Sequence, residues 1–394
     1  MIELSLLGST GSIGTQAIQV IDANPGQFRV CALASGGANI DLLVQQALAL
    51  KVPFVAVADE SKTDELAAAL PGVTIGGGRA AVVEAAQRAS SGTVLNGING
   101  AIGLEATLAA LQSGATLALA NKESLVVGGA LVKKAMVRPG QIVPVDSEHS
   151  AIAQCLAAGK HHKGLTAAVV DGTSDVSQLV LTASGGPFRG KKRAELHAVT
   201  AAQALQHPTW AMGPVVTINS STLVNKGLEL IEAHLLFDID PEKIVPVIHP
   251  QSVVHSMVTW KDGSTIAQAS PPSMLIPIAL GLNWQKRYEN VAPPCNWDVA
   301  ATWNFEPVDH QTFPALQLAR TAVAASPTHP AVYNAANEAM VDAFLKEKVG
   351  YLQIVDTVGE VLAAHDGVAD PSLADIHEVE AWAKSLARQI AGIR

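Results

Sequence analysis

Three polar residues in one stretch of the chain have the types and the spacing that a reaction site requires. Asn225 and Glu229 are four apart and Lys226 and Glu229 are three apart, so in a helix their side chains share one face. The hydroxyls and free amides of a helix start are expected beside them, at residues 219–222 (N-S-S-T). Such a face suits a phosphorylated polyol and a hard metal ion. The same spacing also fits an ordinary solvent-exposed Lys–Glu pair.

A second group of candidates follows the apolar residues 142–145. Asp146 and Glu148 are two apart in V-D-S-E-H-S, so in an extended chain both carboxylates face one side. Paired carboxylate oxygens are ligands that suit Mg²⁺ or Mn²⁺. The alternative is a polar loop in which Ser150 caps a helix over residues 151–157.

The beginning of the chain has a pattern typical of nucleotide binding. A nearly all-apolar strand is predicted at residues 2–7, the turn G-S-T-G-S-I-G occupies residues 8–14, and a helix is predicted at residues 15–23. Glycine lets the backbone approach a pyrophosphate, which then sits at the helix N-terminus. A purely structural glycine turn is the alternative. The next strand, residues 29–34, ends in S-G-G-A-N without the acidic residue usual in NAD sites, which favours NADP.

These candidates must be positioned by a doubly wound α/β fold, because strands and helices alternate through the first part of the chain. In such a fold, ligands bind beyond the carboxyl ends of the strands. Both A-N-K-E-S, which ends at Ser124, and V-D-S-E-H-S follow predicted strand ends. Further strands are predicted at residues 54–58, 73–75, 93–95, 116–120 and 142–145, and helices at residues 40–50, 63–69, 80–89 and 103–113.

The middle of the chain is predicted to be an α+β catalytic domain with an open sheet. The turn at residues 184–186 (S-G-G) could cradle an anion or be an ordinary tight turn. Trp210, in H-P-T-W-A-M-G, suits a lid that closes over a ligand, and core packing is its alternative. Exposed sheets often pair across a dimer axis, so a homodimer is expected. Residues 214–218 are predicted to be extended, and a strand is predicted at residues 179–182. Residues 245–248, 253–259 and 265–269 alternate as antiparallel strands would, which predicts a sheet of three or four strands.

The last part of the chain is predicted to be a C-terminal helical bundle. Residues 284–312 are rich in Pro, Trp and Asn without periodicity, which indicates a connecting arm. Four helices follow, at residues 314–324, 331–347, 351–364 and 374–390. The expected division is an NADP-binding domain over 1–148, a catalytic and dimerisation domain over 149–283, the arm over 284–312 and the helical domain over 313–394.

Composition excludes several classes of function. The chain has 394 residues, of which 48% are hydrophobic and 15% charged, which is typical of a multidomain globular enzyme. A net charge of −9 provides no broad basic surface for nucleic acid. Cys31, Cys155 and Cys295 have no metal or disulfide spacing and indicate a reducing compartment. No signal peptide and no membrane-spanning run is present, so a cytoplasmic protein without a membrane partner is expected.

Taken together, six motifs resemble those of the 1-deoxy-D-xylulose 5-phosphate reductoisomerase family. They are G-S-T-G-S-I-G, A-N-K-E-S, V-D-S-E-H-S, T-A-S-G-G-P-F-R, H-P-T-W-A-M-G and N-S-S-T-L-V-N-K-G-L-E, in this order over essentially the whole chain. The resemblance implies a metal-dependent NADPH enzyme of the non-mevalonate isoprenoid pathway. Its substrate would be a small phosphorylated sugar and its product 2-C-methyl-D-erythritol 4-phosphate.

The resemblance also implies a role for each matching residue. The metal, which would be Mg²⁺, Mn²⁺ or Co²⁺, would be held by Asp146, Glu148 and Glu229. The substrate would contact Lys122, Ser147, Glu148, Ser184, His207, Ser220, Asn225, Lys226 and Glu229, with Trp210 on the lid. NADPH would contact Thr10, Gly11, Ser12, Ile13, Gly36, Gly37, Asn39, Asn121, Glu123 and Gly213. The family often has a Lys or Arg within residues 35–39, and this chain has none.

The implied reaction gives each part a task. The carbon skeleton would break and rejoin by a retro-aldol and aldol sequence, and a hydride would then reduce the aldehyde. A divalent metal would act as Lewis acid, and Lys122 could offset developing enolate charge. Phosphate binding would drive lid closure. His149 and His207 both remain candidates for a general base.

Two other functions are compatible with the same first domain. One is a plain NAD(P) dehydrogenase of a phosphorylated polyol, which needs no metal. The other is a non-catalytic redox sensor that binds NADP and contacts partners through its helical tail. Whether Asp146, Glu148 and Glu229 converge on one point distinguishes the reductoisomerase from the plain dehydrogenase.

Overall fold

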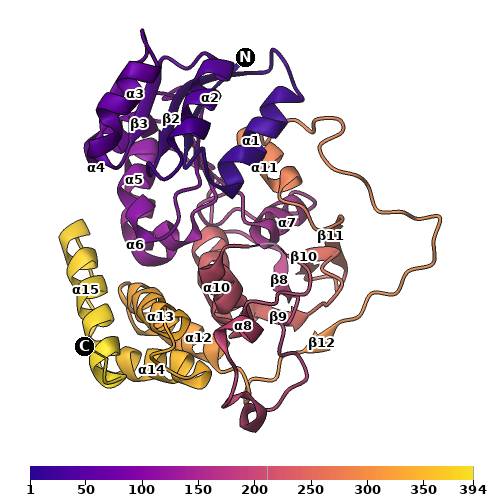
Figure 1. Cartoon of the computed structure of the whole chain (residues 1–394). Helices are drawn as coiled ribbons and strands as arrows, with labels where there is room; N and C mark the ends of the chain where they lie inside the picture. The colour runs from indigo at the N-terminus through magenta and orange to yellow at the C-terminus, as the bar shows by residue number, and fades with distance from the viewer. Residues whose placement is uncertain (211, 394) are drawn as a thin grey trace.

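The first part of the chain forms the expected doubly wound sheet. The computed structural model describes residues 1–210 and 212–393. Seven parallel strands lie in the order β4-β3-β2-β1-β5-β6-β7, with helices packed around them (Figure 1). The order reverses between β1 and β5, which is where ligands bind in such sheets. The strands are β1 (Ile2–Leu7), β2 (Phe28–Ser35), β3 (Phe54–Val57), β4 (Thr74–Gly77), β5 (Thr93–Asn96), β6 (Thr116–Leu119) and β7 (Ile142–Pro144).

Helices connect these strands, as parallel pairing requires. Those predicted at residues 40–50 and 63–69 have these bounds, whereas the first helix begins three residues earlier than predicted, at Ser12. It begins there because Gly11 accepts the first helical hydrogen bond, from the Thr15 amide. The helix after β6 was not predicted. The helices are α1 (Ser12–Asp22), α2 (Ile40–Leu50), α3 (Thr63–Ala69), α4 (Gly78–Gln87), α5 (Leu104–Gln112) and α6 (Lys122–Ala135).

The segment after β7 corrects one expectation. Asp146 is the N-cap residue of α7 (Ser147–Leu156), and Glu148 lies in its first turn. The two carboxylates are therefore not neighbours on an extended chain, and Ser150 is inside the helix rather than at its cap. β7 ends at Pro144, and Ser147, His149 and Ser150 in the first turn of α7 are buried.

The second sheet is mixed rather than antiparallel. Its five strands lie in the order β11-β10-β8-β9-β12, and β8 pairs with β9 in parallel. The antiparallel prediction is confirmed for β10, which pairs in this way with β11 and β8. It was wrong for β9 beside β8, because helices between these two strands provide the long connection that a parallel pair needs. The strands are β8 (Val176–Ala183), β9 (Ile244–Ile248), β10 (Val254–Trp260), β11 (Thr265–Ala269) and β12 (Glu306–Pro307).

The helices between β8 and β9 correct a second expectation. Residues 214–218, which were predicted to be extended, begin α9 (Pro214–Ser221), with a proline in the first turn, where its missing amide is harmless. Leu223 then takes a left-handed conformation with φ of 60°, and α10 (Val224–Phe237) follows. Residues 219–222 are thus the end of one helix and the turn to the next. The short α8 (Ala201–Ala204) precedes them.

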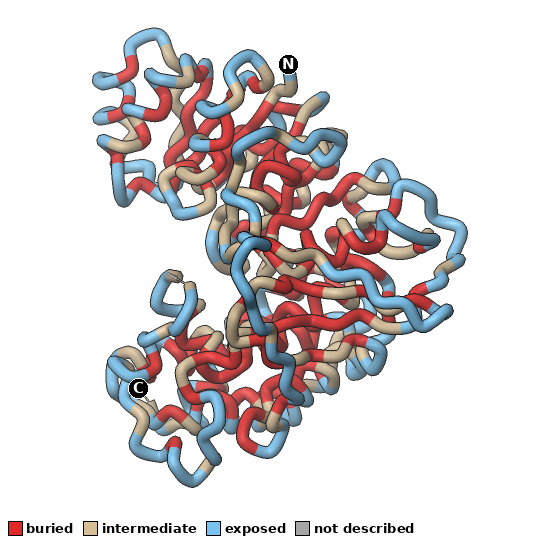
Figure 2. The backbone as a smooth tube through the Cα atoms, turned by 90° about the vertical axis from the view of Figure 1, so that its right-hand side faces the viewer, coloured by how far each residue is buried: buried red, intermediate tan, exposed pale blue. Residues whose placement is uncertain are grey.

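The chain crosses back before it ends. α11 (Leu275–Leu282) packs against α1, β5, β6 and β7 of the first sheet. The arm that follows runs along the outside of the molecule to β12 (Figure 1), and Figure 2 shows it mostly exposed beside the buried sheets. Four helices form the end of the chain: α12 (Ala315–Ala325), α13 (His329–Leu345), α14 (Tyr351–Ala363) and α15 (Leu373–Ile390).

Two apolar cores hold these layers together. One lies between the first sheet and α1, α2, α3 and α11. The other begins on the opposite face of that sheet and continues through the second sheet and α10 into the C-terminal helices. Within this continuous core, α10 packs against both α6 and α7. Within the described residues, no helix has both the length and the apolar character needed to cross a membrane.

Candidate active site

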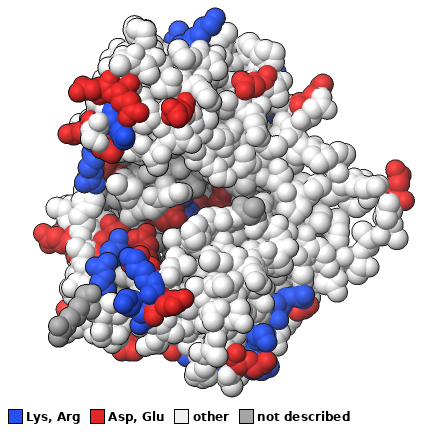
Figure 3. Space-filling model, viewed as in Figure 1, with Lys and Arg blue, Asp and Glu red and all other residues white. Residues whose placement is uncertain are grey.

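Three carboxylates from two helices converge at the centre of the molecule. Asp146 and Glu148 lie at the start of α7, at the carboxyl edge of the first sheet, and Glu229 lies within α10. One carboxylate oxygen of each lies within 4.8 Å of the others. The space-filling view shows a hollow at this level with acidic and basic atoms on its floor (Figure 3). The convergence expected for a metal-dependent enzyme is therefore present.

Two lysines join the carboxylates. Lys122, at the start of α6, contacts Asp146 through its ammonium group and lies 3.2 Å from Glu229 Oε1. Lys226 contacts Glu229 and lies 2.6 Å from Glu148 Oε1. Both lysine side chains are at most 12% exposed, so these contacts are shielded from water. Two ammonium groups against three carboxylates leave the cluster negative, which favours a bound cation.

Burial and the lysines act differently on two of the carboxyl groups. Burial raises the pKa of Glu229 to about 7, and the nearby Glu148 adds to the shift while Lys226 and Lys122 reduce it. Burial would also raise the pKa of Glu148, but Lys226 and Lys122 outweigh it and hold that pKa well below its usual range. Glu148 is thus ionised at neutral pH, whereas a proton competes with any cation for Glu229.

Asn225, on the same face of α10, contacts both Lys122 and Glu229. Its side-chain oxygen lies 3.2 Å from Lys122 Nζ, and its side-chain amide donates to Glu229 Oε1. The spacing of Asn225, Lys226 and Glu229 along a helix therefore places them together as expected. On α7, Ser147 donates to Glu148 Oε2 at 2.5 Å.

Behind the carboxylates lies a buried pair formed by His149, which was a candidate base from the sequence, and Glu232, which was not identified. Glu232 and His149 are both fully buried, and Glu232 Oε2 lies 3.2 Å from His149 Nδ1. The other ring nitrogen, Nε2, donates to the Glu229 carbonyl at 2.8 Å. Enclosed in this way, His149 does not face a substrate. The signal available in the sequence was spacing: Glu232 follows Asn225 and Glu229 at i+7 and i+3, on the same helical face.

A hydroxyl and imidazole cluster lies at the end of β8. Ser184 follows β8, and its hydroxyl lies 3.1 Å from His207 Nε2. His207 Nδ1 accepts from the amides of Thr209 and Trp210, so the neutral ring donates from Nε2 to Ser184. Burial lowers the pKa of His207, which keeps the ring neutral. Ser184 Oγ accepts this bond, and its own proton is free to donate to a ligand.

A tight turn brings the end of α9 to this cluster. Gly186 has φ of +66°, and a Cβ added there would lie 3.0 Å from the Ser220 carbonyl. Only glycine allows this approach, so Ser184 and Ser220 lie on facing segments. The S-G-G turn therefore has a packing reason as well as the anion-binding possibility derived from the sequence.

The half-buried Trp210 packs edge-on against His255, with ring centroids 6.2 Å apart. It is neither fully exposed nor a core residue. Ala211, the next residue of the expected lid, lies outside the described residues. His255, on β10, is buried and was not identified from the sequence, where an isolated histidine in a strand gives no signal.

The glycine turn after β1 has the geometry of a nucleotide site. Gly8 has φ of +78°, and a Cβ on Gly14 would lie 2.4 Å from Ser9 Cα, so bulkier residues would displace the turn. Gly11 is the N-cap of α1 and has no side chain that could accept a hydrogen bond from the first-turn amides. The amides of Ser12 and Ile13 in the first turn are therefore free for a phosphate.

Other expected nucleotide contacts surround this turn. Thr10 Oγ1 lies 2.8 Å from Ser35 Oγ, at the tip of β2. A Cβ on Gly36 would meet no atom within 4 Å, so its backbone faces open space. Gly37, with φ of +107°, lies against Val57 and Asp59.

Three of the expected nucleotide residues have structural tasks of their own. The side-chain oxygen of Asn39 caps α2 by accepting from the Leu42 amide. Asn121 caps α6 and donates to the Gly100 carbonyl at 2.9 Å. Gly213 caps α9 and accepts from Thr217 within that helix. Glu123 is partly exposed at the start of α6, and burial of its carboxyl raises its pKa.

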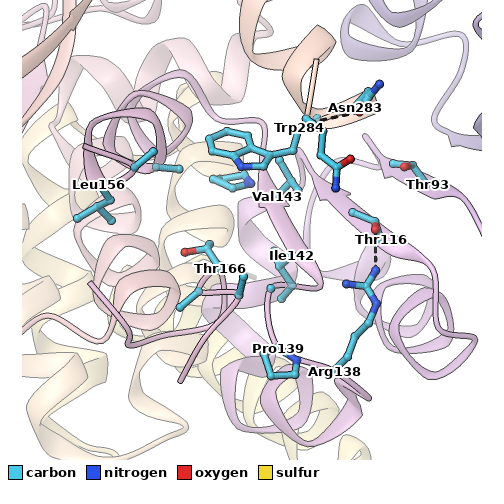
Figure 4. Close-up of a pocket in the computed structure, with 18 of the residues that line it drawn as sticks. Thr93, Thr116, Arg138, Pro139, Ile142, Val143, Leu156, Thr166, Asn283 and Trp284 are labelled. Carbon is cyan, nitrogen blue, oxygen red and sulfur yellow. Dashed lines mark hydrogen bonds between the residues drawn. The ribbon is translucent and has the colours of Figure 1, made fainter. Parts of the chain in front are cut away.

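A separate cavity of about 730 Å³ lies at the amino ends of β5, β6 and β7. Figure 4 shows Thr93, Thr116 and the indole ring of Trp284 among its lining residues, and the dashed bond from Arg138 to Thr116. It is at the opposite edge of the sheet from the glycine turn, and it includes none of the expected site residues.

Comparisons with known proteins agree over the whole chain. The family model of 1-deoxy-D-xylulose 5-phosphate reductoisomerase matches residues 4–129, and two models of its C-terminal domains match residues 142–237 and 269–386. The reductoisomerase of Beutenbergia cavernae is 57% identical over 98% of this chain and 96% of its own length. That of Kitasatospora griseola is 54% identical over 98% and 99%.

Solved structures give the same result. The reductoisomerase of Zymomonas mobilis in complex with NADPH superposes with a TM-score of 0.89, at 38% identity over 99% of both chains. A reductoisomerase in complex with NADPH, fosmidomycin and magnesium has a TM-score of 0.87, at 34% identity over 100% of this chain and 98% of that one. The chain belongs to the 1-deoxy-D-xylulose 5-phosphate reductoisomerase family.

Proposed function

We propose that Asp146, Glu148 and Glu229 bind the divalent metal with which this chain carries out the reaction of its family. That reaction is the NADPH-dependent conversion of 1-deoxy-D-xylulose 5-phosphate to 2-C-methyl-D-erythritol 4-phosphate. The observation that carries the proposal is the convergence of three carboxylates, two at the start of α7 and the buried Glu229 on α10, with one oxygen of each within 4.8 Å of the others. A plain dehydrogenase has no use for such a cluster, so the metal-dependent reaction is favoured.

The donor set fits a hard cation. All three ligand atoms are carboxylate oxygens, which suit Mg²⁺ and equally admit Mn²⁺ or Co²⁺. When bound, the cation supplies a Lewis acid for neighbouring carbonyl and hydroxyl oxygens of the substrate. A solved relative was crystallised with magnesium, which supports Mg²⁺ as the ion of this chain.

Around the metal site, the side chains of this chain bind and orient the substrate. Lys122, already 3.2 Å from Glu229, is placed to balance negative charge that develops on a substrate oxygen. Ser184 accepts a hydrogen bond from His207 and can donate its own hydroxyl hydrogen bond to the phosphate, with Ser220 on the facing segment. Lys226 and Asn225 provide further polar contacts for the hydroxyl end of the substrate.

Two features exclude water and hold the nucleotide. Trp210 rests against His255 and covers the polar cluster as part of a lid, which protects the reactive intermediate from solvent. The glycine turn offers free amides of Ser12 and Ile13 to the NADPH pyrophosphate. The tip of β2 carries no acidic residue to repel a 2′-phosphate.

We further infer that the chain acts as a homodimer in the cytoplasm. β11 is an edge strand of the second sheet whose first three residues are exposed, and Trp297 on the arm is 74% exposed. Edge strands and large exposed apolar side chains are commonly covered by a partner. The three cysteines are unpaired and two are buried, which supports a reducing compartment.

The test uses the full chain freed of metal with a chelator. NADPH absorbance is followed after addition of 1-deoxy-D-xylulose 5-phosphate, with and without Mg²⁺, and the product is identified by mass spectrometry. We expect oxidation only with Mg²⁺ and a loss of at least about 100-fold in Glu229→Gln, since one of three ligands is neutralised. Glu360→Gln, at an exposed site on α14, is the control. Metal-independent turnover would reject the proposal.

A further inference from the structure

Glu232 is a fully buried carboxyl group for which the reaction has no assigned use. Its Oε2 lies 3.2 Å from His149 Nδ1, and among the described residues neither carboxyl oxygen has a well-formed hydrogen bond. A buried carboxyl with so few partners is unfavourable to folding. Its retention inside α10 therefore indicates a task that an apolar residue would not perform.

The contacts of His149 indicate this task. His149 follows Glu148 on α7, and its Nε2 donates to the Glu229 carbonyl on α10 at 2.8 Å. Since Nε2 carries the ring proton that it donates to Glu229, the contact between Nδ1 and Glu232 needs one further proton, which these two groups share. The imidazole ring also stacks on Phe237 of α10, with centroids 6.4 Å apart and planes at 18°. The imidazole ring of His149 on α7 thus contacts three residues of α10: Glu229, Glu232 and Phe237.

The alternative to a shared proton between His149 and Glu232 is a bound cation. One ligand atom each of Asp146, His149 and Glu232 lie within 4.8 Å of one another, which is also a spacing for a metal ion. However, Asp146 belongs to both trios and is already a ligand of the proposed metal site with Glu148 and Glu229. Only His149 and Glu232 then remain at this place, and the 3.2 Å between Nδ1 and Oε2 suits a shared proton.

We propose that Glu232 is a positioning residue that acts through His149 and holds α7 and α10 at the separation required by Asp146, Glu148 and Glu229. The inference rests on the proposed metal-binding role of these three carboxylates. A ring turned away from Glu232 would no longer fix the Glu229 carbonyl. Glu229 would then move relative to Glu148, and a divalent ion would bind a distorted set of ligands.

Two variants of the full chain separate positioning from folding. Glu232→Leu has a similar volume and removes the polar partner of His149. Glu232→Gln retains a donor for Nδ1 through its side-chain amide. Mn²⁺ binding is measured by electron paramagnetic resonance of the free ion, NADPH binding by fluorescence, and folding by thermal unfolding. Loss of a partner behind a metal ligand weakens metal binding about 10- to 100-fold.

We expect wild type to bind one Mn²⁺ per chain, Glu232→Leu to bind it at least about tenfold more weakly, and Glu232→Gln to stay within about threefold of wild type. NADPH binding stays unchanged in both variants. The Mg²⁺ concentration for half-maximal activity rises in Glu232→Leu, whereas kcat at saturating Mg²⁺ stays within about threefold. A general structural role would not produce this split or the rescue by glutamine.

Glu380→Leu is the matched control, because Glu380 is also a buried carboxyl with an unpartnered oxygen, on α15. It leaves Mn²⁺ binding unchanged. If Glu232→Leu does not unfold cooperatively, His149→Phe decides: it retains the ring beside Phe237 without the nitrogens and must show the same weakening.

Three results would overturn the inference. The first is wild-type Mn²⁺ affinity in Glu232→Leu or, where that variant does not fold, in His149→Phe. The second is two Mn²⁺ ions in wild type and one in Glu232→Leu, which would establish a second cation site instead. The third is no Mn²⁺ bound to wild type, which would reject the metal assignment itself and this inference with it.

Discussion

Lys226 Nζ of α10 lies 2.6 Å from Glu148 Oε1 of α7, and the two side chains are 5% and 18% exposed. The same ammonium group contacts Glu229. One cation of the protein thus joins carboxylates from both helices. It keeps Glu148 ionised, and it stands where the negative cluster meets the expected position of the substrate.

Replacing Lys226 by Gln tests this relationship. Removing one partner of a buried ion pair costs about 3 to 5 kcal/mol, because the other charge is left unpaired. We expect urea unfolding to show a loss of this order at pH 8 without metal, and the KM for substrate to rise. Lys346→Gln is the control, since Lys346 pairs with Asp342 at the surface, at 2.8 Å, and should change stability by less than about 0.5 kcal/mol.

Ser184 provides a second test, of the phosphate end of the site. Its hydroxyl is held by His207 Nε2, and a hydrogen bond to a charged group contributes about 1.5 to 3 kcal/mol. Ser184→Ala should therefore lower kcat/KM for 1-deoxy-D-xylulose 5-phosphate by about 10- to 100-fold while NADPH affinity is retained. Ser177→Ala, at an exposed position of β8, the strand that precedes Ser184, should match wild type. Equal kinetics of the two variants would contradict the assignment.

Glu380 gives a prediction for the pH dependence of stability. Burial raises its pKa from 4.5 to about 7 in the folded chain, with Lys384 partly offsetting the shift. Below pH 4.5 the group is protonated in both states and burial carries no penalty. As pH rises towards 7, the unfolded chain ionises first, so stability is lost and stays lost above pH 7.

Glu380→Gln should therefore remove this loss. At pH 8 we expect the variant to be more stable than wild type by about 1 to 3 kcal/mol, at roughly 1.4 kcal/mol for each unit of pKa shift. At pH 4.5 the two should agree within about 0.5 kcal/mol. Urea unfolding at the two pH values measures the difference, and a gain that does not depend on pH would contradict burial of the ionised carboxylate as its cause.

Gly14 tests the nucleotide site. A Cβ there would lie 2.4 Å from Ser9 Cα and 2.5 Å from the Gly8 carbonyl oxygen, so Gly14→Ala must displace the turn. We expect NADPH affinity, measured by fluorescence, to fall by at least about tenfold, with Mn²⁺ binding unchanged. Gly350→Ala is the control, because φ there is −78° and the nearest atom to an added Cβ is 3.5 Å away. An unchanged NADPH affinity in Gly14→Ala would argue against this turn as the pyrophosphate site.

Much of the fold followed from local pattern. The parallel strands read as short apolar runs because they are buried on both faces, and β2, for example, has one exposed residue in eight. Helices α2 and α3 had their predicted bounds. Helix α9 was missed and the start of α10 was placed too early, since N-S-S-T at residues 219–222 resembles a helix start. There the left-handed Leu223, which packing stabilises at 3% exposure, overrides local preference.

The sequence by itself determined which groups could react: Asn225, Lys226 and Glu229 at helical spacing, and the acids at 146 and 148 after a buried strand. Spacing along a chain is local, so it needs no knowledge of distant partners. Only the tertiary structure decided that α7 and α10 meet, that the ammonium of Lys226 bridges them and that Glu232 lies behind His149. These contacts depend on how far-apart segments share one core, because desolvation and pairing of charges exist only once that core has formed.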